Sequence, residues 1–96
     1  MKPFKLFFET LSNEVRWKII HILQNGKMRA TDISDELGYE QSRVSQNLKR
    51  LRTCGFVFVE KSGRERIYKL NSDTIKPLLQ LMDKHIKNYC KDCVEN

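Results

Sequence analysis

Two amphipathic patterns separated by Gly38 constrain the fold of this chain more than any other feature of its sequence. Apolar residues recur at helical spacing on both sides of this glycine: Ile33, Leu37, Val44, Leu48 and Leu51. Glycine ends helices well because it tolerates the left-handed backbone conformation found there. The third helix is therefore predicted from Ala30 or Thr31 to the glycine, and the fourth packs a narrow stripe on the core. We expect a helix-turn-helix unit over about residues 30–54.

A β-hairpin is predicted directly after the fourth helix. Gly55 ends that helix, and residues 56–61 (FVFVEK) have the β-branched and aromatic composition of a strand. Ser62 and Gly63 provide a turn, and residues 65–70 (ERIYKL) form the returning strand. Two arginines belong to this hairpin, at its tip and just inside it: Arg64 and Arg66. The hairpin, at about residues 56–70, therefore presents positive charge at its end.

Two further helices are predicted before this unit. A first helix over residues 4–11 is indicated by four apolar side chains at helical spacing: Phe4, Phe7, Phe8 and Leu11. Ser12 or Asn13 can cap a second helix with its own apolar positions: Val15, Ile19, Ile22 and Leu23. Asn25 and Gly26 stop the second helix, and residues 27–29 are expected to form a short connector.

The last helix is expected over about residues 73–93, after a cap at Asn71, Ser72 or Asp73 and with Pro77 in its first turn. One side of it is apolar over most of its length: Ile75, Leu78, Leu79, Met82, Ile86, Tyr89, Cys90 and Cys93. So long a stripe exceeds what a lone domain of 96 residues can cover. A partner surface is the economical explanation, with the first helix as the other wall of the interface.

Positive charge is concentrated in one part of the chain. Lys plus Arg number 18 against 12 Asp plus Glu, which gives a net charge of +6. Residues 41–66 contain seven of the basic and two of the acidic residues, so +5 of the total lies within about a quarter of the chain. Such a concentration is expected of a surface that faces phosphates.

The sequence favours a single cytoplasmic domain over residues 1–96, with no enzymatic activity and no cofactor. No stretch approaches the roughly 18 consecutive apolar residues of a membrane span, and the N-terminal segment lacks the unbroken apolar run of a signal peptide. The three cysteines are too few and too unevenly spaced for a secreted disulfide framework. We find no supported nucleophile–base pair, phosphate-binding glycine loop or credible pair of catalytic carboxylates.

The fourth helix has a polar and basic outer face. At about 100° per residue, four side chains point away from the apolar stripe: Ser42, Gln46, Lys49 and Thr53. Arg43, Ser45 and Arg50 flank them, and no acidic residue occurs from Gln41 to Thr53. An ordinary surface helix usually includes Glu or Asp for pairing four residues apart. Their absence favours a polyanionic partner.

These side chains match the chemistry of B-DNA, whose major groove admits one α-helix. Arg43 can pair with the two acceptors of guanine, and Gln46 or Gln41 with the donor and acceptor of adenine. The short serines suit contacts close to the helix backbone, whereas the basic residues further along, including Arg52, favour phosphates. The hairpin arginines can follow the backbone or enter the minor groove. The predicted DNA-binding residues are Gln41, Ser42, Arg43, Ser45, Gln46, Lys49, Arg50, Arg64 and Arg66.

Helix, turn, helix and basic hairpin in this order form a winged helix-turn-helix, and residues 11–70 resemble the ArsR-type family of repressors. The resemblance is carried by TDISDELGYEQSRVSQNLKRLRTCGFV and by the hairpin SGRERIYKL. It implies a mainly α-helical fold of five helices with a β-hairpin wing. It also implies a homodimer through the first and last helices, which binds an imperfect palindrome in double-stranded DNA and releases it on a signal. The alternative from another class is a winged-helix module that binds only protein.

Many ArsR-type proteins sense metals, and the resemblance locates two kinds of metal site. The positions of a Cys-x-Cys in the third helix are Arg29 and Thr31 here, and neither is a soft ligand. The second kind, at the last helix, retains one ligand among its four positions: Ser72, Thr74, His85 and Asn88. One ligand does not hold a zinc ion that needs about four. Neither site is intact, so we assign no metal.

The Cys90-x-x-Cys93 pair leaves three interpretations open. Residues three apart share a helix face, so both thiols can pack at the dimer interface as small apolar groups. They can instead form a thiol–disulfide redox element, or bind a metal with partner cysteines or with His85. The last two interpretations would make the chain a DNA-binding redox or metal sensor. Cys54, at the end of the fourth helix, is expected to serve packing only.

Overall fold

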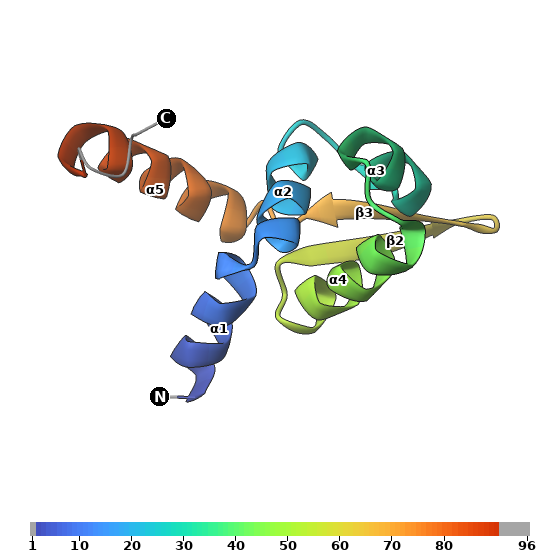
Figure 1. The fold of residues 1–96 in the computed structure, drawn as a ribbon, viewed down its shortest axis with the longest axis horizontal. Coiled ribbons are helices and arrows are strands. Elements are labelled where there is room, and N and C mark those ends of the chain that lie inside the picture. Colours follow the sequence, from blue (N-terminus) through green and yellow to red (C-terminus); the bar gives the residue numbers. More distant parts are fainter. Residues whose placement is uncertain (1, 91–96) are drawn as a thin grey trace.

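Five helices and three strands form residues 2–90, the part of the chain that this computed structural model describes (Figure 1). In chain order they are α1 (Lys2–Ser12), α2 (Glu14–Leu23), β1 (Met28–Arg29), α3 (Ala30–Leu37), α4 (Gln41–Thr53), β2 (Val57–Ser62), β3 (Glu65–Leu70) and α5 (Ile75–Tyr89). The expected winged helix-turn-helix is confirmed, with α3 and α4 as the helix-turn-helix unit and the β2–β3 hairpin as the wing.

One apolar core joins α2, α3 and α4 to the base of the wing. Its most deeply buried side chains come from all four parts: Ile19, Ile20, Ile33, Val44, Leu48, Leu51, Phe56 and Val57. The stripe predicted for α4 is confirmed, whereas in α2 the fully buried Ile20 was not predicted and Ile22 packs at the margin. Each such burial contributes about 1.5–3 kcal/mol, so the core holds α4 firmly in one orientation.

A side-chain hydrogen bond marks the start of α2, and a glycine marks the end of α3. Asn13 caps α2, since its Oδ1 accepts from the backbone N–H of Arg16 at 3.0 Å. Gly38 ends α3 with a left-handed φ of +74°, and its N–H donates to the Ser34 carbonyl at 2.9 Å. The chain then needs only two residues to enter α4, which keeps the helix-turn-helix tight. Pro77 lies in the first turn of α5, as expected.

The segment expected to be a connector contains a strand instead. Met28 and Arg29 form β1, which pairs antiparallel with β3 opposite Tyr68 and Ile67. The sheet order is therefore β1-β3-β2, and the wing has a third strand at its root. Two residues are too few for an alternating pattern, which is why the sequence did not indicate this strand. At the far end the hairpin turns at Gly63, whose φ is +64°.

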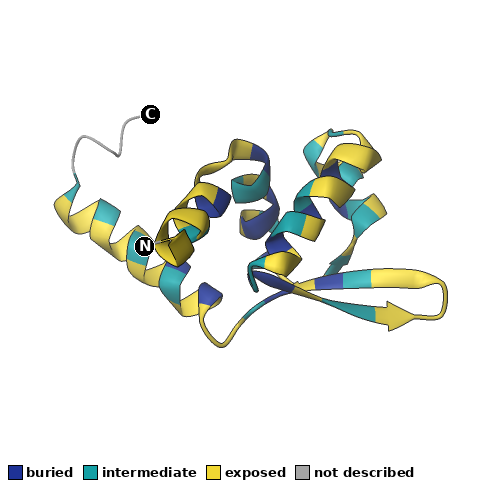
Figure 2. Cartoon of the chain, turned by 90° about the horizontal axis from the view of Figure 1, so that it is seen from below, coloured by how far each residue is buried: buried dark blue, intermediate teal, exposed yellow. Residues whose placement is uncertain are grey.

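Helices α1 and α5 project from the body in different directions (Figure 1), and many of their residues are exposed (Figure 2). In α1, Leu11 is buried and Phe7 stacks on Phe56, with ring centroids 5.0 Å apart. Phe4 and Phe8 face solvent, with 66% and 60% of their surface exposed. The described part of α5 is shorter than the predicted 73–93, and Leu81 within it is also exposed. None of the helices described is long and apolar enough to cross a membrane.

Candidate nucleic-acid interface

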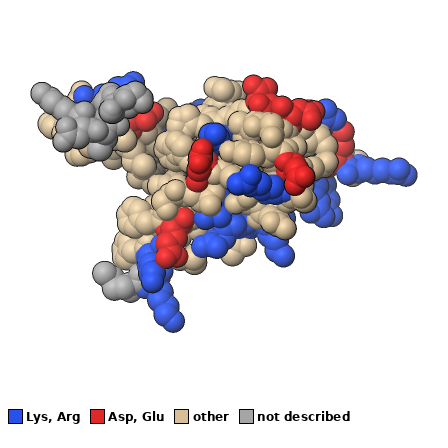
Figure 3. All heavy atoms as spheres, viewed as in Figure 1, with Lys and Arg blue, Asp and Glu red and all other residues tan. Residues whose placement is uncertain are grey.

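The outer face of α4 is exposed as the helical pattern predicts. Its polar side chains all lie at the surface: Gln41, Ser42, Arg43, Ser45, Gln46, Lys49, Arg52 and Thr53. They extend from the buried stripe of α4, so the core fixes their orientation. Lys and Arg atoms gather below α4 and at the tip of the wing, whereas Asp and Glu atoms gather on the upper edge over α3 (Figure 3). This charge separation gives the molecule one face suited to a polyanion.

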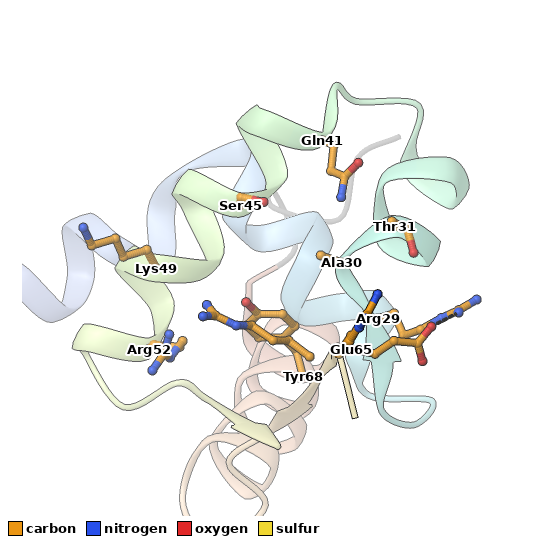
Figure 4. A pocket seen from close by; sticks show the side chains of 11 residues that line it. Arg29, Ala30, Thr31, Gln41, Ser45, Lys49, Arg52, Glu65 and Tyr68 are labelled. Carbon is orange, nitrogen blue, oxygen red and sulfur yellow. Dashed lines mark hydrogen bonds and ion pairs between the residues drawn. The ribbon is translucent and has the colours of Figure 1, made fainter. Parts of the chain in front are cut away.

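A cleft of about 590 Å³ lies between α4, the start of α3 and the wing. Gln41, Ser45, Lys49 and Arg52 line it along α4, and Thr31 lies across from them (Figure 4). The wing contributes Arg64, Glu65, Arg66 and Tyr68. The wing arginines predicted from the sequence thus share one concave surface with part of the α4 set. Ser42, Arg43 and Gln46 lie outside this cleft, further around the outer face of α4.

Arg29 also lines the cleft, and sequence reasoning did not include it among the DNA-facing residues. Its guanidinium donates to both carboxylate oxygens of Asp32, at 3.0 and 3.1 Å, and to Oε2 of Glu65 at 2.6 Å. These bonds raise the pKa of Arg29 and lower the pKa of Asp32. The ion pairs join the start of α3 to the first residue of β3. No sequence pattern signals a pairing between residues so far apart.

Arg43 packs against the turn that precedes α4. Its guanidinium carbon lies 4.9 Å from the centroid of the Tyr39 ring, and the ammonium of Lys18 lies 5.8 Å from the same centroid. A cation over an aromatic face is attracted by the negative potential of the ring. Hydrogen bonds to Tyr39 and Glu14 raise the pKa of Lys18. Tyr39 therefore restrains the arginine that the sequence assigns to a guanine.

Arg50 lies differently from what the helical pattern predicts. It was expected to flank the outer face and to contact phosphates, but it is partly buried. Its Nε donates to Oγ1 of Thr10 in α1, at 3.2 Å. The reason is that the flank of α4 opposite the cleft packs near the end of α1, whose position the sequence does not reveal. Arg52, on the cleft side, is the basic residue of this turn that faces outward.

Of the residues considered for a redox or metal sensor, Cys90 and His85 lie within the described part of the chain. Cys90 follows the last residue of α5, and its backbone N–H donates to the Ile86 carbonyl. Cys93 lies outside the described residues, so the redox interpretation stays a prediction. His85 is exposed and its ring lies 5.5 Å from that of Tyr89. Among residues 2–90 no group of three or more His, Cys, Asp or Glu side chains is arranged to hold a metal ion.

Comparison with known proteins identifies the family. The model of the bacterial regulatory protein arsR family matches residues 13–58, which include α2, α3, α4 and the first two residues of β2. An HTH-type transcriptional regulator of Mycobacterium tuberculosis, Rv0081, is 30% identical over 89 residues, covering 92% of this chain and 78% of the relative. The chain belongs to the ArsR family. The crystal structure of Rv0081 has a TM-score of 0.82, at 29% identity, over 93% of this chain and 90% of that one.

Other ArsR-type relatives are similar over most of the chain. The transcriptional regulator NmtR of Mycobacterium tuberculosis is 35% identical over 71 residues, which are 74% of this chain and 59% of NmtR. The arsenical resistance operon repressor of Staphylococcus xylosus is 26% identical over 82 residues, covering 85% of this chain and 79% of the repressor. In this ArsR-family chain, Arg29 stands where the family resemblance places the first cysteine of a metal site, and ion pairs occupy its guanidinium.

Proposed function

We propose that the chain is a homodimeric repressor that binds an imperfect palindrome in double-stranded DNA through α4 and the wing, in the cytoplasm and without catalysis. The observation that carries the proposal is the outer face of α4, which has no acidic side chain and continues into the basic cleft beside the wing. Phosphates attract this surface, and Gln46 and Arg43 supply the groups that read bases.

The proposed dimer is supported by apolar side chains that remain exposed in a single copy. Phe4 and Phe8 of α1 and Leu81 of α5 are exposed on the two helices that project from the body. Apolar surface of this kind is stabilised by burial against a second copy. Two copies related by a two-fold axis would present two α4 helices, which is why we expect a palindromic site.

Selection of binding sites from random duplexes tests this function directly. We expect a palindrome with a fixed distance between half-sites and affinities in the nanomolar range that weaken steeply with salt, since binding releases counterions. The selection is read with and without reductant and zinc, so that a sensor role of Cys90 and Cys93 would appear as a change in affinity. Failure to bind any duplex at low salt would contradict the proposal and favour the protein-interaction module.

A further inference from the structure

A hydrogen-bonded network joins α1, α2 and α4 on the flank of α4 opposite the cleft. Arg16, near the start of α2, lies at its centre. Its Nε donates to the Thr10 carbonyl at 2.8 Å, and one terminal nitrogen donates to the Glu9 carbonyl at 3.2 Å. The other terminal nitrogen donates to Oδ1 of Asn47 in α4 at 3.1 Å. One guanidinium thus connects the last turn of α1 to the middle of α4, the proposed recognition helix that would enter the major groove.

A second guanidinium connects the same two helices. Arg50 donates to Oγ1 of Thr10, a residue with no exposed surface, and Sγ of Cys54 lies 3.3 Å from that oxygen. Asn47 extends the network within α4, because its Nδ2 donates to the Arg43 carbonyl at 2.8 Å. The network therefore extends from the end of α1 to the turn of α4 that carries a predicted base-reading side chain.

These hydrogen bonds fix the orientation of α1 relative to α4, whereas the apolar contacts of α1 do not. Elsewhere α1 meets the body through the stacking of Phe7 on Phe56 and through Leu11, and apolar burial has little directionality. The carbonyls of Glu9 and Thr10 belong to the last turn of α1, which no intrahelical N–H satisfies. A planar guanidinium fork that bonds three acceptors fixes their relative positions. Burial and the nearby Arg50 lower the pKa of Arg16, in keeping with two guanidiniums placed close together.

We propose that Arg16 and Asn47 are positioning residues that fix the angle between α1 and the recognition helix α4, and thereby the distance between the two DNA half-sites that one dimer accepts. This inference rests on the proposed function, since α1 sets that distance only if it belongs to the dimer interface. Adding one base pair between half-sites rotates them relative to each other by about 35°, because one turn contains 10–10.5 base pairs. A rigid α1–α4 angle makes the dimer intolerant of that rotation.

The test measures the affinity of the full chain for a series of palindromes that differ only in the spacer. The series contains the selected spacing and spacings one and two base pairs longer and shorter. For the parent we expect affinity to fall about tenfold or more one base pair from the optimum, and for Asn47→Ala less than about threefold. Affinities are expressed relative to the best spacing, so a loss of folded protein lowers all values equally and leaves the profile unchanged.

Two variants serve as controls. Asn47→Asp keeps an acceptor for Arg16, so it should restore the steep profile even though its added negative charge weakens binding at every spacing. Asn25→Ala removes an exposed asparagine after α2 and should match the parent. A profile for Asn47→Ala as steep as that of the parent overturns the inference, and so does a flat profile for the parent. A parent that binds no duplex contradicts the proposed function instead.

Discussion

Gln46 and Arg64 are two exposed side chains of the proposed DNA interface, and we expect them to serve different purposes. Gln46 lies at the centre of the outer face of α4, where its amide offers a donor and an acceptor side by side. That pattern matches the edge of adenine in the major groove. Arg64 lies at the end of the wing, beside the turn at Gly63, and lines the cleft as a cation. Base reading is therefore assigned to the first residue and phosphate attraction to the second.

Substitution of these two residues should have different consequences. We expect Gln46→Ala to lower the discrimination against a mismatched base by about 1–3 kcal/mol at one position of each half-site, since a bidentate contact is lost. Arg64→Ala should weaken binding to all duplexes by a similar factor and reduce the salt slope by about one unit. Gel-shift titrations on the selected palindrome and its single-base variants measure both effects. If the two variants lost affinity in the same way across the palindrome and its single-base variants, this assignment would be contradicted.

At the scale of single residues, the sequence predicts which functional groups α4 presents better than it predicts the partners that each side chain contacts. The outer positions of α4 follow from helical periodicity alone, and all but one of them are exposed as expected. Arg50 departs from this pattern because it finds a hydroxyl acceptor in α1, which belongs to a different helix. Arg29 was missed for a similar reason, since its partner Glu65 lies across the sheet. A helical pattern gives the angle of a side chain on its own helix and not the partners that other elements supply.

At the scale of elements, the position of the wing depends on the ion pairs at its root. The tip of the hairpin extends beyond the body (Figure 1), and β1 pairs with β3 only at Ile67 and Tyr68. Just outside this pairing, Glu65 contacts Arg29, which also binds Asp32 of α3. A carboxylate inside a basic cleft opposes the approach of phosphates. Its presence there suits a role in holding the wing against the start of α3, where Arg29 and Asp32 lie.

Replacing Glu65 distinguishes this role from simple repulsion. If Glu65 only repels phosphate, Glu65→Gln should strengthen DNA binding. We expect it instead to weaken binding by about twofold to fivefold, the range of a surface ion pair, because the wing loses its contact with Arg29. Asp35→Asn is the control, since it removes an exposed carboxylate from α3 and should strengthen binding slightly. Fluorescence anisotropy with a labelled palindrome measures these changes, and tighter binding by Glu65→Gln would refute the idea.

The elements themselves were largely predictable, because glycines and periodic apolar residues mark their limits. Gly38 and Gly63 adopt the left-handed conformation that the predicted turns require. The connector that became β1 shows the limit of such reasoning. Met28 and Arg29 are extended because Tyr68 and Ile67 lie beside them, and that pairing is a property of the folded chain.

At the scale of the whole molecule, α1 has two sets of apolar side chains. One set is packed within a single copy, and the other remains exposed. Leu11 and Phe7 attach α1 to the core, whereas Phe4 and Phe8 point into solvent. The sequence places all four on one helix but does not show which are buried. Their burial depends on how far α1 extends beyond the core. The same holds for α5, in which the predicted apolar stripe contains both the buried Leu79 and the exposed Tyr89.

Disruption of the exposed face of α1 should dissociate the proposed dimer and leave the fold intact. We expect Phe4→Ser to weaken dimerisation about tenfold or more, the effect of losing an aromatic side chain from the centre of an interface. DNA affinity should fall with it, because a monomer contacts only one half-site. Phe58→Ser, which alters an exposed phenylalanine of β2, should remain dimeric. Sedimentation velocity over a range of concentrations measures both, and an unchanged dimer in Phe4→Ser would exclude this interface.

The pairing of β1 with β3 has a consequence for the order in which the chain folds. The contacts among α2, α3 and α4 are local in sequence, and the β2–β3 hairpin also forms from neighbouring residues. Met28 and Tyr68, in contrast, come together only when the long segment between them closes, which carries an entropic cost. We therefore expect β1 to join the sheet after the helix-turn-helix unit and the hairpin have formed, and to separate from β3 before either of them unfolds. A molecule in that opened state still displays a complete recognition helix, beside a hairpin that has lost its third strand.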